Sequence, residues 1–583
     1  MTAEPTRAAI DSLFISRSTL TSEGNKTGSW RFLRPRYNEK TSPCSAACPA
    51  GEDIGRIEML TSQGQLKEAW ETILQENPFA GVCGRVCYHP CELVCNRGHF
   101  DEPVAVQIIE RSLSENADRY GLKPDLERLP SKNKKIAVIG AGPSGLTSAY
   151  FLTRLGYSCD VFESNHEAGG MLRFGIPSYR LPPAPLRNEI ERISRIGFTI
   201  HLGKRLSEHF FEEARGNYEA VLVGCGLGRT PRLIIPGEDL EGVEDGLSFL
   251  EQVNRETFPA LDGRVAVLGG GNTAIDVARS VMRLGAKALI LYRRRRQDMP
   301  AFEEEIEMAL EEGLEIRELW APLDIQSEGK GLRLTGQLMQ VKGMDQTGRA
   351  QVEPISGKTE TFLVNRVFKA IGLEAAEEWL IPPEKAPNSI SLANSLILPA
   401  SHGPARVFIG DLAVTSKSVV QAVGSAKEAA IALDVFFEKG PQAIAAELSA
   451  CRVGTGPSLS MEMYLKGPRS TRNPHLVNYE EINHDHFQFS PRIIYPRLLK
   501  TERVHSFTEI NLKISADLAM REAKRCFNCG LCNQCDNCRL FCPDLAVLRE
   551  DTSQGRRINY DYCKGCGICV VECPRNAMVL EEE

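Results

Sequence analysis

The chain has 583 residues and a formal net charge of −7, with 69 Lys or Arg against 76 Asp or Glu. This acidic balance, without a basic tract that carries interleaved aromatic residues, argues against a nucleic-acid-binding protein. Residues 1–30 are polar and lack the apolar core of a secretory signal, and no run of about 18 apolar residues could span a bilayer. We therefore expect a cytoplasmic protein without membrane insertion, and at about 150 residues per domain the length predicts three to five domains.

Cysteine is unusually frequent, with 19 residues, and its spacing is informative. All but Cys159, Cys225 and Cys451 fall in tight groups with the intervals of metal ligands. These three positions are typical of cysteines that occupy small apolar spaces in a protein core. Such grouping indicates an intracellular metal-cluster protein rather than a disulfide scaffold.

The N-terminal part combines an unstructured pattern with the first cysteine group. Residues 1–42 are polar without clear periodicity, which predicts an extended arm. Six cysteines follow, at Cys44, Cys48, Cys83, Cys87, Cys91 and Cys95. Gly84, Pro90 and Gly98 break a continuous helix and leave loops that can wrap a metal cluster. The spacing favours an iron–sulfur site in a helical domain at 43–125, and zinc is the rival because six cysteines can hold one or two tetrahedral ions.

A strand, a glycine turn, a helix and a second strand follow one another in residues 135–163. In this pattern Gly140 permits a tight turn, Gly142 lets the backbone approach a pyrophosphate, and Gly145 lets the helix pack closely on the strand. Glu163 ends the second strand, where an acid binds a ribose hydroxyl. The unit therefore predicts an adenine dinucleotide site.

The same unit recurs further along the chain. A strand at 264–268 leads into a turn with Gly269, Gly271, Asn272 and Thr273, and a second strand follows a helix. This strand ends in four consecutive arginines, Arg293, Arg294, Arg295 and Arg296, instead of an acid. Arginine at this edge suits a 2′-phosphate, which favours NADP over NAD. A solvated basic turn is the alternative, because only one or two of the four side chains can reach a phosphate.

Two short apolar strands return the chain to the first nucleotide unit. They end at Ala370-Ile-Gly372 and at Gly410-Asp411. We therefore expect one nucleotide domain formed by 130–260 and 365–437, with the second, at 261–364, inserted between them. Residues 438–520 are rich in proline and irregular, which predicts a linker across the surface.

Two perfect repeats of C-x2-C-x2-C-x3-C-P lie at the C-terminal end, within 521–583. This is the bacterial ferredoxin pattern, in which the fourth cysteine of each run binds the other [4Fe–4S] cluster. One cluster is thus expected on Cys532, Cys535, Cys538 and Cys573, and the other on Cys563, Cys566, Cys569 and Cys542. Cys526 and Cys529 extend the run upstream and have no evident place in either set, which leaves them as spare thiols or as ligands to a partner's metal.

Several motifs together carry a family resemblance over residues 43–437. They are Glu163, Gly169-Gly170, Gly175-Ile-Pro, Arg180-Leu-Pro, Pro236-Gly-Glu-Asp, Gly269-Gly-Gly-Asn-Thr-Ala, Tyr292-Arg-Arg, Met299-Pro and Gly410-Asp411. In these the chain resembles the glutamate synthase small (β) subunit family, which includes the N-terminal half of dihydropyrimidine dehydrogenase. With its ferredoxin repeats it is further similar to the NAD(P)H-linked flavoprotein associated with dissimilatory sulfite reductase.

The resemblance implies a multidomain α/β protein with FAD in the first nucleotide unit and NADP or NAD in the second. It would place around FAD the residues Gly140, Gly142, Gly145, Glu163, Gly170, Leu172, Arg180, Gly410 and Asp411. It would place around the nicotinamide cofactor Gly269, Gly271, Asn272, Thr273, Arg293 and Arg294. Both nucleotide domains would then be Rossmann-like, as in glutathione reductase.

The resemblance also implies N-terminal cluster ligands, with one departure. Cys48, Cys87 and Cys91 would hold a cluster together with Glu110, a non-cysteine ligand. A second cluster would retain only Cys44 and Cys95, with Cys83 as a recruit, because residues 38–43 lack the two further cysteines of the family. We expect one N-terminal cluster and leave the second open.

The cofactors together predict the reaction. A nicotinamide gives hydride, clusters take single electrons, and FAD can do both, so we expect an NAD(P)H:acceptor oxidoreductase without a catalytic acid or base. Its partner would be a 2-oxoacid oxidoreductase, a sulfite reductase, a glutamate synthase large subunit or a ferredoxin. The alternatives are a non-catalytic electron-relay subunit and the small subunit of a glutamate synthase.

Overall fold

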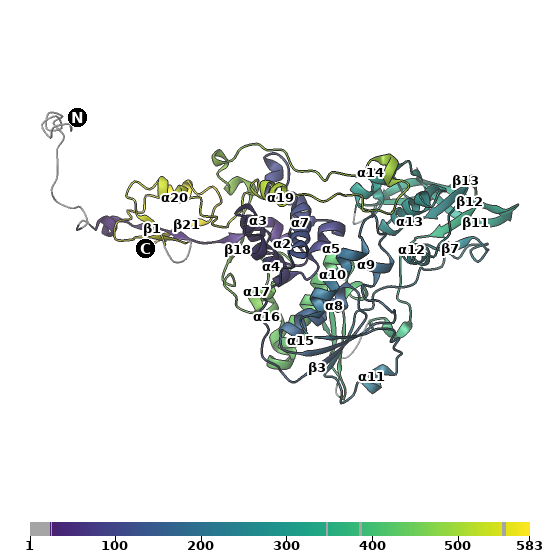
Figure 1. Cartoon of the computed structure of the whole chain (residues 1–583), viewed down its shortest axis with the longest axis horizontal. Coiled ribbons are helices and arrows are strands. Elements are labelled where there is room, and N and C mark those ends of the chain that lie inside the picture. Colours follow the sequence, from purple (N-terminus) through teal and green to yellow (C-terminus); the bar gives the residue numbers. More distant parts are fainter. Residues whose placement is uncertain (1–23, 25, 346–347, 384–387, 401, 551–554) are drawn as a thin grey trace.

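The computed structural model describes residues 24, 26–345, 348–383, 388–400, 402–550 and 555–583. It is an elongated α/β protein with a central helical domain (Figure 1). The ferredoxin-like C-terminal part lies at one end, the second nucleotide domain lies at the other, and the first nucleotide domain lies beside the centre. Within the described ranges, no helix has both the length and the apolar content needed to cross a membrane.

The first nucleotide domain is built on a seven-stranded sheet. Its strand order is β15-β16-β17-β6-β3-β4-β5, and all neighbours from β17 to β5 are parallel. The parallel strands are β3 (Lys135–Ile139), β4 (Ser158–Phe162), β5 (Thr199–His201), β6 (Ala220–Val223) and β17 (Ala405–Phe408). β15 (Ile390–Ser391) and β16 (Leu396–Leu398) add an antiparallel edge. The central strands are continuous apolar runs because both faces are covered.

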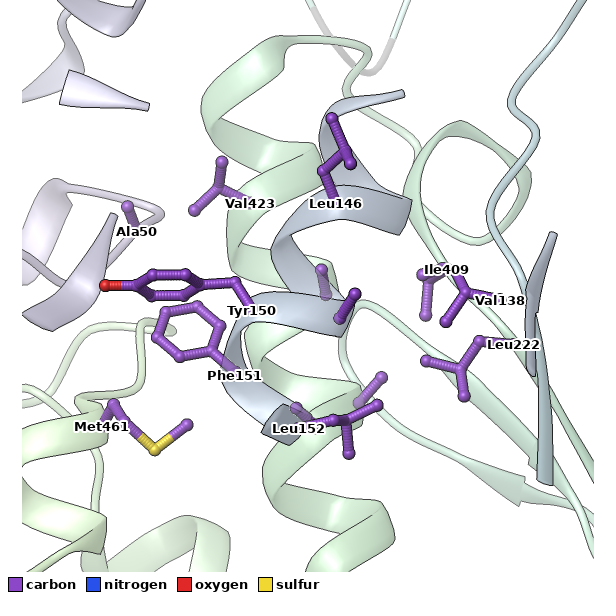
Figure 2. Close-up of a cluster of buried hydrophobic side chains, with 14 of the residues drawn as sticks. Ala50, Val138, Leu146, Tyr150, Phe151, Leu152, Leu222, Ile409, Val423 and Met461 are labelled. Atoms are coloured by element: carbon purple, nitrogen blue, oxygen red, sulfur yellow. The ribbon is translucent and has the colours of Figure 1, made fainter. Parts of the chain in front are cut away.

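Helix α8 (Pro143–Arg154) joins this sheet to the central domain. It packs against α15 (Val419–Lys439), the long helix after β17. Figure 2 shows Tyr150 and Phe151 of α8 directed toward Ala50 and Met461, while Val138 of β3 lies on the other side. The hydroxyl of Tyr150 also donates to the backbone oxygen of Leu74 at 2.6 Å. One apolar core therefore extends from the sheet through α8 into the neighbouring domain.

The second nucleotide domain has a five-stranded parallel sheet of order β10-β9-β8-β14-β7. Its strands are β7 (Val243–Asp245), β8 (Arg264–Leu268), β9 (Lys287–Leu291), β10 (Glu315–Arg317) and β14 (Arg366–Lys369). Helices α12 (Gly246–Asn254), α13 (Asn272–Arg283) and α14 (Glu303–Glu312) belong to this domain. A three-stranded antiparallel sheet projects from it, formed by β11 (Trp320–Glu328), β12 (Gly331–Met344) and β13 (Ala350–Val364).

The central domain is helical and is completed by a distant segment. Its N-terminal helices are α2 (Pro43–Ala47), α3 (Ile54–Ser62), α4 (Leu66–Glu76), α5 (Ala80–Val86), α6 (Pro90–Leu93) and α7 (Val106–Arg119). Helix α19 (Ala516–Ala523) packs on α3 and α7. Ala519 and Ala523 of α19 are buried in the same core as Ile57 and Leu60 of α3. Residues more than 400 positions apart in the sequence thus share one domain core.

The described part of the N-terminal arm contains a short 3-10 helix, η1 (Thr27–Trp30), and two strands that pair with distant segments. β1 (Leu33–Tyr37) pairs antiparallel with β21 (Met578–Glu582), the last strand of the chain. β2 (Lys40–Thr41) pairs with β18 (Asn473–Leu476). The C-terminal part also contains β19 (Val547–Arg549), α20 (Asn537–Leu540), β20 (Arg556–Ile558) and α21 (Ile568–Val571). The arm therefore holds the ferredoxin-like part against the rest of the chain.

Residues 438–520, where we expect a linker, contain short helices and contact both the first nucleotide domain and the central domain. They include α16 (Ile444–Ala450), α17 (Met461–Tyr464) and α18 (Lys500–Arg503). The amide of Ile510 donates to the backbone oxygen of Tyr179 at 3.0 Å. Glu509 pairs with Arg85 of α5 at 2.8 Å. The domain boundaries themselves stay predictions.

A buried ion pair links α4, α15 and the start of α17. Lys427 is fully buried and its ammonium group pairs with the carboxylate of Glu76, which is also buried. The same carboxylate accepts hydrogen bonds from the hydroxyl of Ser460 at 2.6 Å and from the amide of Met461 at 2.8 Å. Removing one partner of a buried pair leaves an uncompensated charge in a medium that solvates it poorly.

We predict that Lys427→Met lowers the free energy of unfolding by about 3–5 kcal/mol, because the Glu76 carboxylate then lies buried without its counter-charge. Lys439→Met on the same helix is the matched control. Its pair with Glu447 is 2.6 Å long but solvent-exposed, and such pairs contribute about 0–1 kcal/mol. Thermal and urea unfolding of both variants measure the difference, and equal midpoints would contradict the prediction.

Candidate functional site

The first glycine turn is shaped by close backbone contacts and has one open position. Gly140 has φ +99°, and a Cβ there would lie 2.7 Å from Cα of Cys225. A Cβ on Gly145 would lie 1.9 Å from the backbone oxygen of Gly140, so strand and helix meet without room for a side chain. At Gly142, in contrast, the nearest atom to a Cβ is Cα of Gly170, 3.9 Å away. The turn is therefore open over Gly142, at the N-terminus of α8.

Glu163 follows β4 and its carboxylate is hydrogen-bonded to this turn. Oε2 accepts a hydrogen bond from the amide of Ala141 at 2.9 Å. Oε1 accepts from the amide and the side-chain nitrogen of Asn165 at 2.8 and 3.0 Å. Because a carboxylate oxygen can accept more than one hydrogen bond, Oε2 retains capacity for a further donor. The arrangement suits a ribose hydroxyl beside the pyrophosphate turn.

Two other segments that we expect around FAD adjoin the same turn. Gly170 has φ +51°, and Leu172 in the next helical turn, α9 (Met171–Phe174), is fully buried. Gly410 has φ +64°, its amide donates to Oγ of Ser425 at 2.9 Å, and a Cβ there would lie 2.6 Å from Oγ of Ser144 on α8. Asp411 follows, and burial raises the pKa of its carboxyl. These residues and the glycine turn together form the candidate flavin site.

Arg180 has different neighbours from those expected. Its guanidinium pairs with Asp276 of α13 at 2.8 Å and with Glu305 of α14 at 2.9 Å, and all three side chains are largely buried. Both carboxylates belong to the second nucleotide domain. The structure therefore places Arg180 at the boundary between the two nucleotide domains, and its contact with FAD stays a prediction.

The second glycine turn repeats the geometry of the first. Gly269 has φ +142°, and a Cβ there would lie 2.1 Å from a backbone oxygen. At Gly271 the nearest atom to a Cβ is 3.9 Å away, so this turn is also open. Asn272 and Thr273 begin α13, and Oδ1 of Asn272 accepts a hydrogen bond from the amide of Phe302 at 3.0 Å. The turn can receive a second pyrophosphate.

The four arginines after β9 divide into two pairs. Arg295 binds Asp298 at 2.8 Å, and Arg296 binds an acidic side chain at 3.1 Å. Arg293 and Arg294 form no side-chain hydrogen bond or ion pair with any described residue, and Nε of Arg294 is buried without a partner. Two guanidinium groups at the end of β9 are therefore available to a ligand.

The C-terminal part contains two cavities lined by cysteines. One is lined by Cys532, Cys535, Cys538 and Cys573, and the other by Cys542, Cys563, Cys566 and Cys569. Each cavity thus gathers three thiols from one sequence run and the fourth from the other run, which is the donor set that a [4Fe–4S] cluster requires. Tyr37 of the arm closes the first cavity, with its hydroxyl 3.2 Å from Sγ of Cys538.

The N-terminal residues Cys48, Cys87, Cys91 and Glu110 form one buried group. Cys48 and Cys91 lie in one apolar core against which Cys87 packs, and Nε2 of His89 lies 3.7 Å from a carboxylate oxygen of Glu110. The amide of His89 donates to Sγ of Cys87 at 3.3 Å, and burial raises the pKa of Glu110 to about 8. Cys83 lies in the same core, and its backbone oxygen accepts a hydrogen bond from the amide of Cys87 at 3.1 Å, so it belongs to this group. Cys95 instead packs against the core of α3, α4 and α7.

Zinc is the rival to iron–sulfur clusters in these groups. A single tetrahedral ion draws its ligand atoms to within about 2.3 Å of one point. In the part of the chain that the structure describes, no three His, Cys, Asp or Glu side chains are placed to hold one metal ion in that way.

Tyr88, which no sequence motif indicated, lies where three domains meet. It is the residue between Cys87 and His89. Its hydroxyl accepts a hydrogen bond from Nε2 of Gln421 on α15 at 3.4 Å, and its ring stacks on Phe302 of the second nucleotide domain with centroids 5.9 Å apart. The group formed by Cys48, Cys87, Cys91 and Glu110 is therefore connected through the Tyr88 side chain to both nucleotide domains.

Comparison with known proteins agrees with this geometry. Residues 134–393 match the pyridine nucleotide-disulphide oxidoreductase family, residues 36–122 match dihydropyrimidine dehydrogenase domain II with its 4Fe-4S cluster, and residues 556–579 match the 4Fe-4S binding domain. The small chain of glutamate synthase [NADPH] from Escherichia coli K12 is 32% identical over 419 residues, which cover 66% of this chain and 87% of that protein. The chain belongs to the glutamate synthase small-chain family.

Two other relatives are subunits of different oxidoreductases. The beta subunit of the NADP(+)-dependent formate dehydrogenase of Moorella thermoacetica is 35% identical over 69% of this chain. The beta subunit of the NADPH-Fe(3+) oxidoreductase of Geobacter sulfurreducens is 32% identical over 70% of this chain. The matched region spans only 60% and 65% of the length of these two relatives.

Family membership and the matched domains confirm several predictions. The matched family models support the expected multidomain α/β fold, FAD and a nicotinamide nucleotide as cofactors, and 4Fe-4S clusters in the N-terminal and C-terminal parts. The residue assignments at each site and the partner are not decided by these comparisons.

Proposed function

We propose that the chain carries electrons from NADPH to a partner redox protein or subunit that docks on its ferredoxin-like end. The observation that carries this proposal is the junction at Tyr88, where the first cysteine group touches both nucleotide domains. When bound, a nicotinamide supplies hydride, a cluster accepts single electrons, and a flavin exchanges with both. The side chains at the junction position these sites and exclude water from between them.

The ferredoxin-like end supports the partner part of the proposal. It exposes large apolar side chains close to the two cysteine-lined cavities, at Leu540, Phe541, Leu545 and Val571. Leu540 and Val571 end the two contacting helices α20 and α21, and exposed apolar side chains that adjoin one another are typical of an interaction site. We propose as partner a 2-oxoacid oxidoreductase, a sulfite reductase, a glutamate synthase large subunit or a ferredoxin. Co-purification from the native source, followed by identification of the bound subunit, distinguishes these classes.

A catalytic enzyme and a silent relay subunit differ in one measurement. Purified protein should reduce an artificial one-electron dye with NADPH as the only donor, because both nucleotide turns are open and two arginines are unpaired. Without NADPH-dependent reduction, the relay alternative would replace the proposal. If the co-purified partner forms glutamate, the chain is the small subunit of a glutamate synthase.

We predict a preference for NADPH over NADH that depends on Arg293 and Arg294. A charge-assisted phosphate contact contributes about 1.5–3 kcal/mol, so replacing both by alanine should lower kcat/KM for NADPH by about ten- to a hundredfold and leave NADH unchanged. Arg296→Ala is the matched control, since that side chain already binds Glu303. Equal or better kcat/KM with NADH in the unaltered protein would contradict the prediction.

We also propose a cytoplasmic location. All 19 cysteines are free thiols in the structure, and most of them lie in the groups described above. Thiols that bind clusters are kept reduced in the cytosol, whereas an oxidising compartment would favour disulfides. Fractionation of the native cells tests this proposal.

A further inference from the structure

Cys526 and Cys529 have no place in the two ferredoxin cavities. Neither Cys526 nor Cys529 is among the described residues that line those cavities. Both cysteines follow α19, the helix that packs on α3 and α7 of the central domain. The chain therefore carries these two thiols into the N-terminal domain before it enters the ferredoxin-like part.

The loop between the two cysteines is fixed to the N-terminal domain by hydrogen bonds. Nδ2 of the buried Asn528 donates to the backbone oxygen of Gly55 in α3 at 3.0 Å. The amide of Lys40 in the arm donates to the backbone oxygen of Gly530 at 2.9 Å. The segment from Cys526 to Gly530 therefore lies between α3 and the arm, held by one side-chain amide and one backbone hydrogen bond.

Four thiols come together at this place. Cys95 and Cys526 pack against the same apolar core of α3, α4 and α7, and Nδ2 of Asn96, the residue after Cys95, donates to Sγ of Cys529 at 3.4 Å. Sγ of Cys44 donates to Oγ of Ser42 at 3.2 Å, and a Cβ on Gly55, whose backbone oxygen binds Asn528, would lie 3.5 Å from that oxygen. Burial and the neighbouring thiols of Cys44, Cys529 and Cys95 raise the pKa of Cys526. All four side chains are at least half-buried. Cys44 and Cys95 are the two N-terminal cysteines for which the sequence offered no further ligands. Cys526 and Cys529 complete a set of four with them.

Polar groups around the four thiols are arranged as around a bound cluster. Nδ2 of Asn96 donates to Sγ of Cys529 at 3.4 Å, and the amide of Asn528 donates to Sγ of Cys526 at 3.3 Å. Hydrogen bonds to sulfur stabilise thiolates and tune a cluster. The fully buried Glu58 interacts with Cys526 and Cys44, and neither of its carboxyl oxygens has a hydrogen-bond partner among the described residues.

We propose that Cys44, Cys95, Cys526 and Cys529 hold a further [4Fe–4S] cluster, with two ligands from the N-terminal domain and two from the segment that leads into the ferredoxin-like part. Four cysteines are the usual ligand set of such a cluster. The chain then carries two N-terminal clusters instead of the one expected from its sequence, and the second depends on the C-terminal segment.

The position of this cluster gives it a role in the proposed electron path. Arg575 lines the first ferredoxin cavity, and its backbone oxygen accepts a hydrogen bond from the amide of Gly530, the residue after Cys529, at 2.6 Å. At the other end of the set, Cys44 in α2 lies one helical turn before Cys48. The proposed cluster therefore adjoins both the group at Cys48 and that cavity. This role rests on the proposed function, whereas the presence of the cluster does not.

Iron content tests the cluster independently of any electron acceptor. Anaerobically purified full-length protein should contain about sixteen iron atoms per chain, from four four-iron clusters. The double variant Cys526→Ala/Cys529→Ala should lose about four of these, and one electron paramagnetic resonance signal of the reduced protein, while FAD content is unchanged. Cys451→Ala, at a buried cysteine outside all the groups, is the matched control and should keep all the iron.

Three results would overturn the proposal. They are about twelve iron atoms in the unaltered protein, unchanged iron in a double variant that retains FAD, and one zinc ion per chain that the double variant loses. If the double variant does not fold, Cys44→Ala must show the same loss of about four iron atoms, and full iron in that variant overturns the proposal. Failure of dye reduction with intact iron would instead count against the proposed function.

Discussion

Replacing Gly142 by valine is expected to give a folded protein without FAD. A Cβ at this position meets no protein atom within 3.9 Å, and the backbone there has φ −81°, which any residue adopts. The side chain would instead fill the open side of the turn, where the pyrophosphate must approach the N-terminus of α8. Each 1.4 kcal/mol of lost binding lowers affinity about tenfold, and a direct clash costs several times that amount.

Flavin absorbance per chain after purification measures the effect, and the iron content shows whether the fold is retained. Gly343→Val is the matched control, because a Cβ on Gly343 in β12 also has no atom within 4 Å and lies far from the turn. Gly145→Ala is expected to destabilise the protein and not only to remove FAD. Its Cβ would lie 1.9 Å from a backbone oxygen of the turn, so the turn itself could not keep its structure. A full FAD content in Gly142→Val would show that this turn is not part of the FAD site.

The fold class was predictable because its signals are local. Each nucleotide unit is a buried strand, a glycine turn and a helix within about 30 residues, so contacts such as that of Gly145 with Gly140 are encoded by neighbours in the sequence. The ferredoxin repeats are equally local. Their crossed ligand sets follow from a known internal symmetry rather than from any long-range pattern.

The position of Cys526 and Cys529 in the N-terminal domain could not be predicted from local sequence signals. It depends on α19 packing against α3, whose residues lie more than 400 positions earlier, and on hydrogen bonds from the loop to α3 and the arm. The pairing of β1 with β21 is similar, since a short edge strand carries no mark of its partner. Arg180 shows the same limit, because its acidic partners Asp276 and Glu305 come from another domain.

The second large effect is expected when the cluster site in the second ferredoxin cavity is disrupted. Cys563→Ala/Cys566→Ala takes two of the four thiols from the cavity that also contains Cys542 and Cys569. Iron should fall by about four atoms per chain, while FAD content and NADPH-dependent dye reduction remain. Electron delivery to the co-purified partner should fall to background, because the last site before the partner is missing.

This double variant distinguishes the alternatives better than a deletion of the ferredoxin-like part. Cutting the chain before Arg521 would also remove Cys526, Cys529, the end of α19 and β21, the partner of β1. A loss of activity would then not distinguish a missing outlet from a damaged N-terminal domain. The point variant keeps these contacts, and Cys451→Ala again serves as the control for the loss of a cysteine.

Partner reduction is the decisive measurement, because a small dye can accept electrons at any exposed site. Cys566 is exposed and the apolar side chains of Leu545 and Val571 lie on the same C-terminal part, which agrees with transfer to a docked protein at this end. If the variant reduces the partner at the full rate, electrons must leave from a cluster in the N-terminal domain. The exposed apolar surface of the C-terminal part would then serve assembly rather than electron transfer.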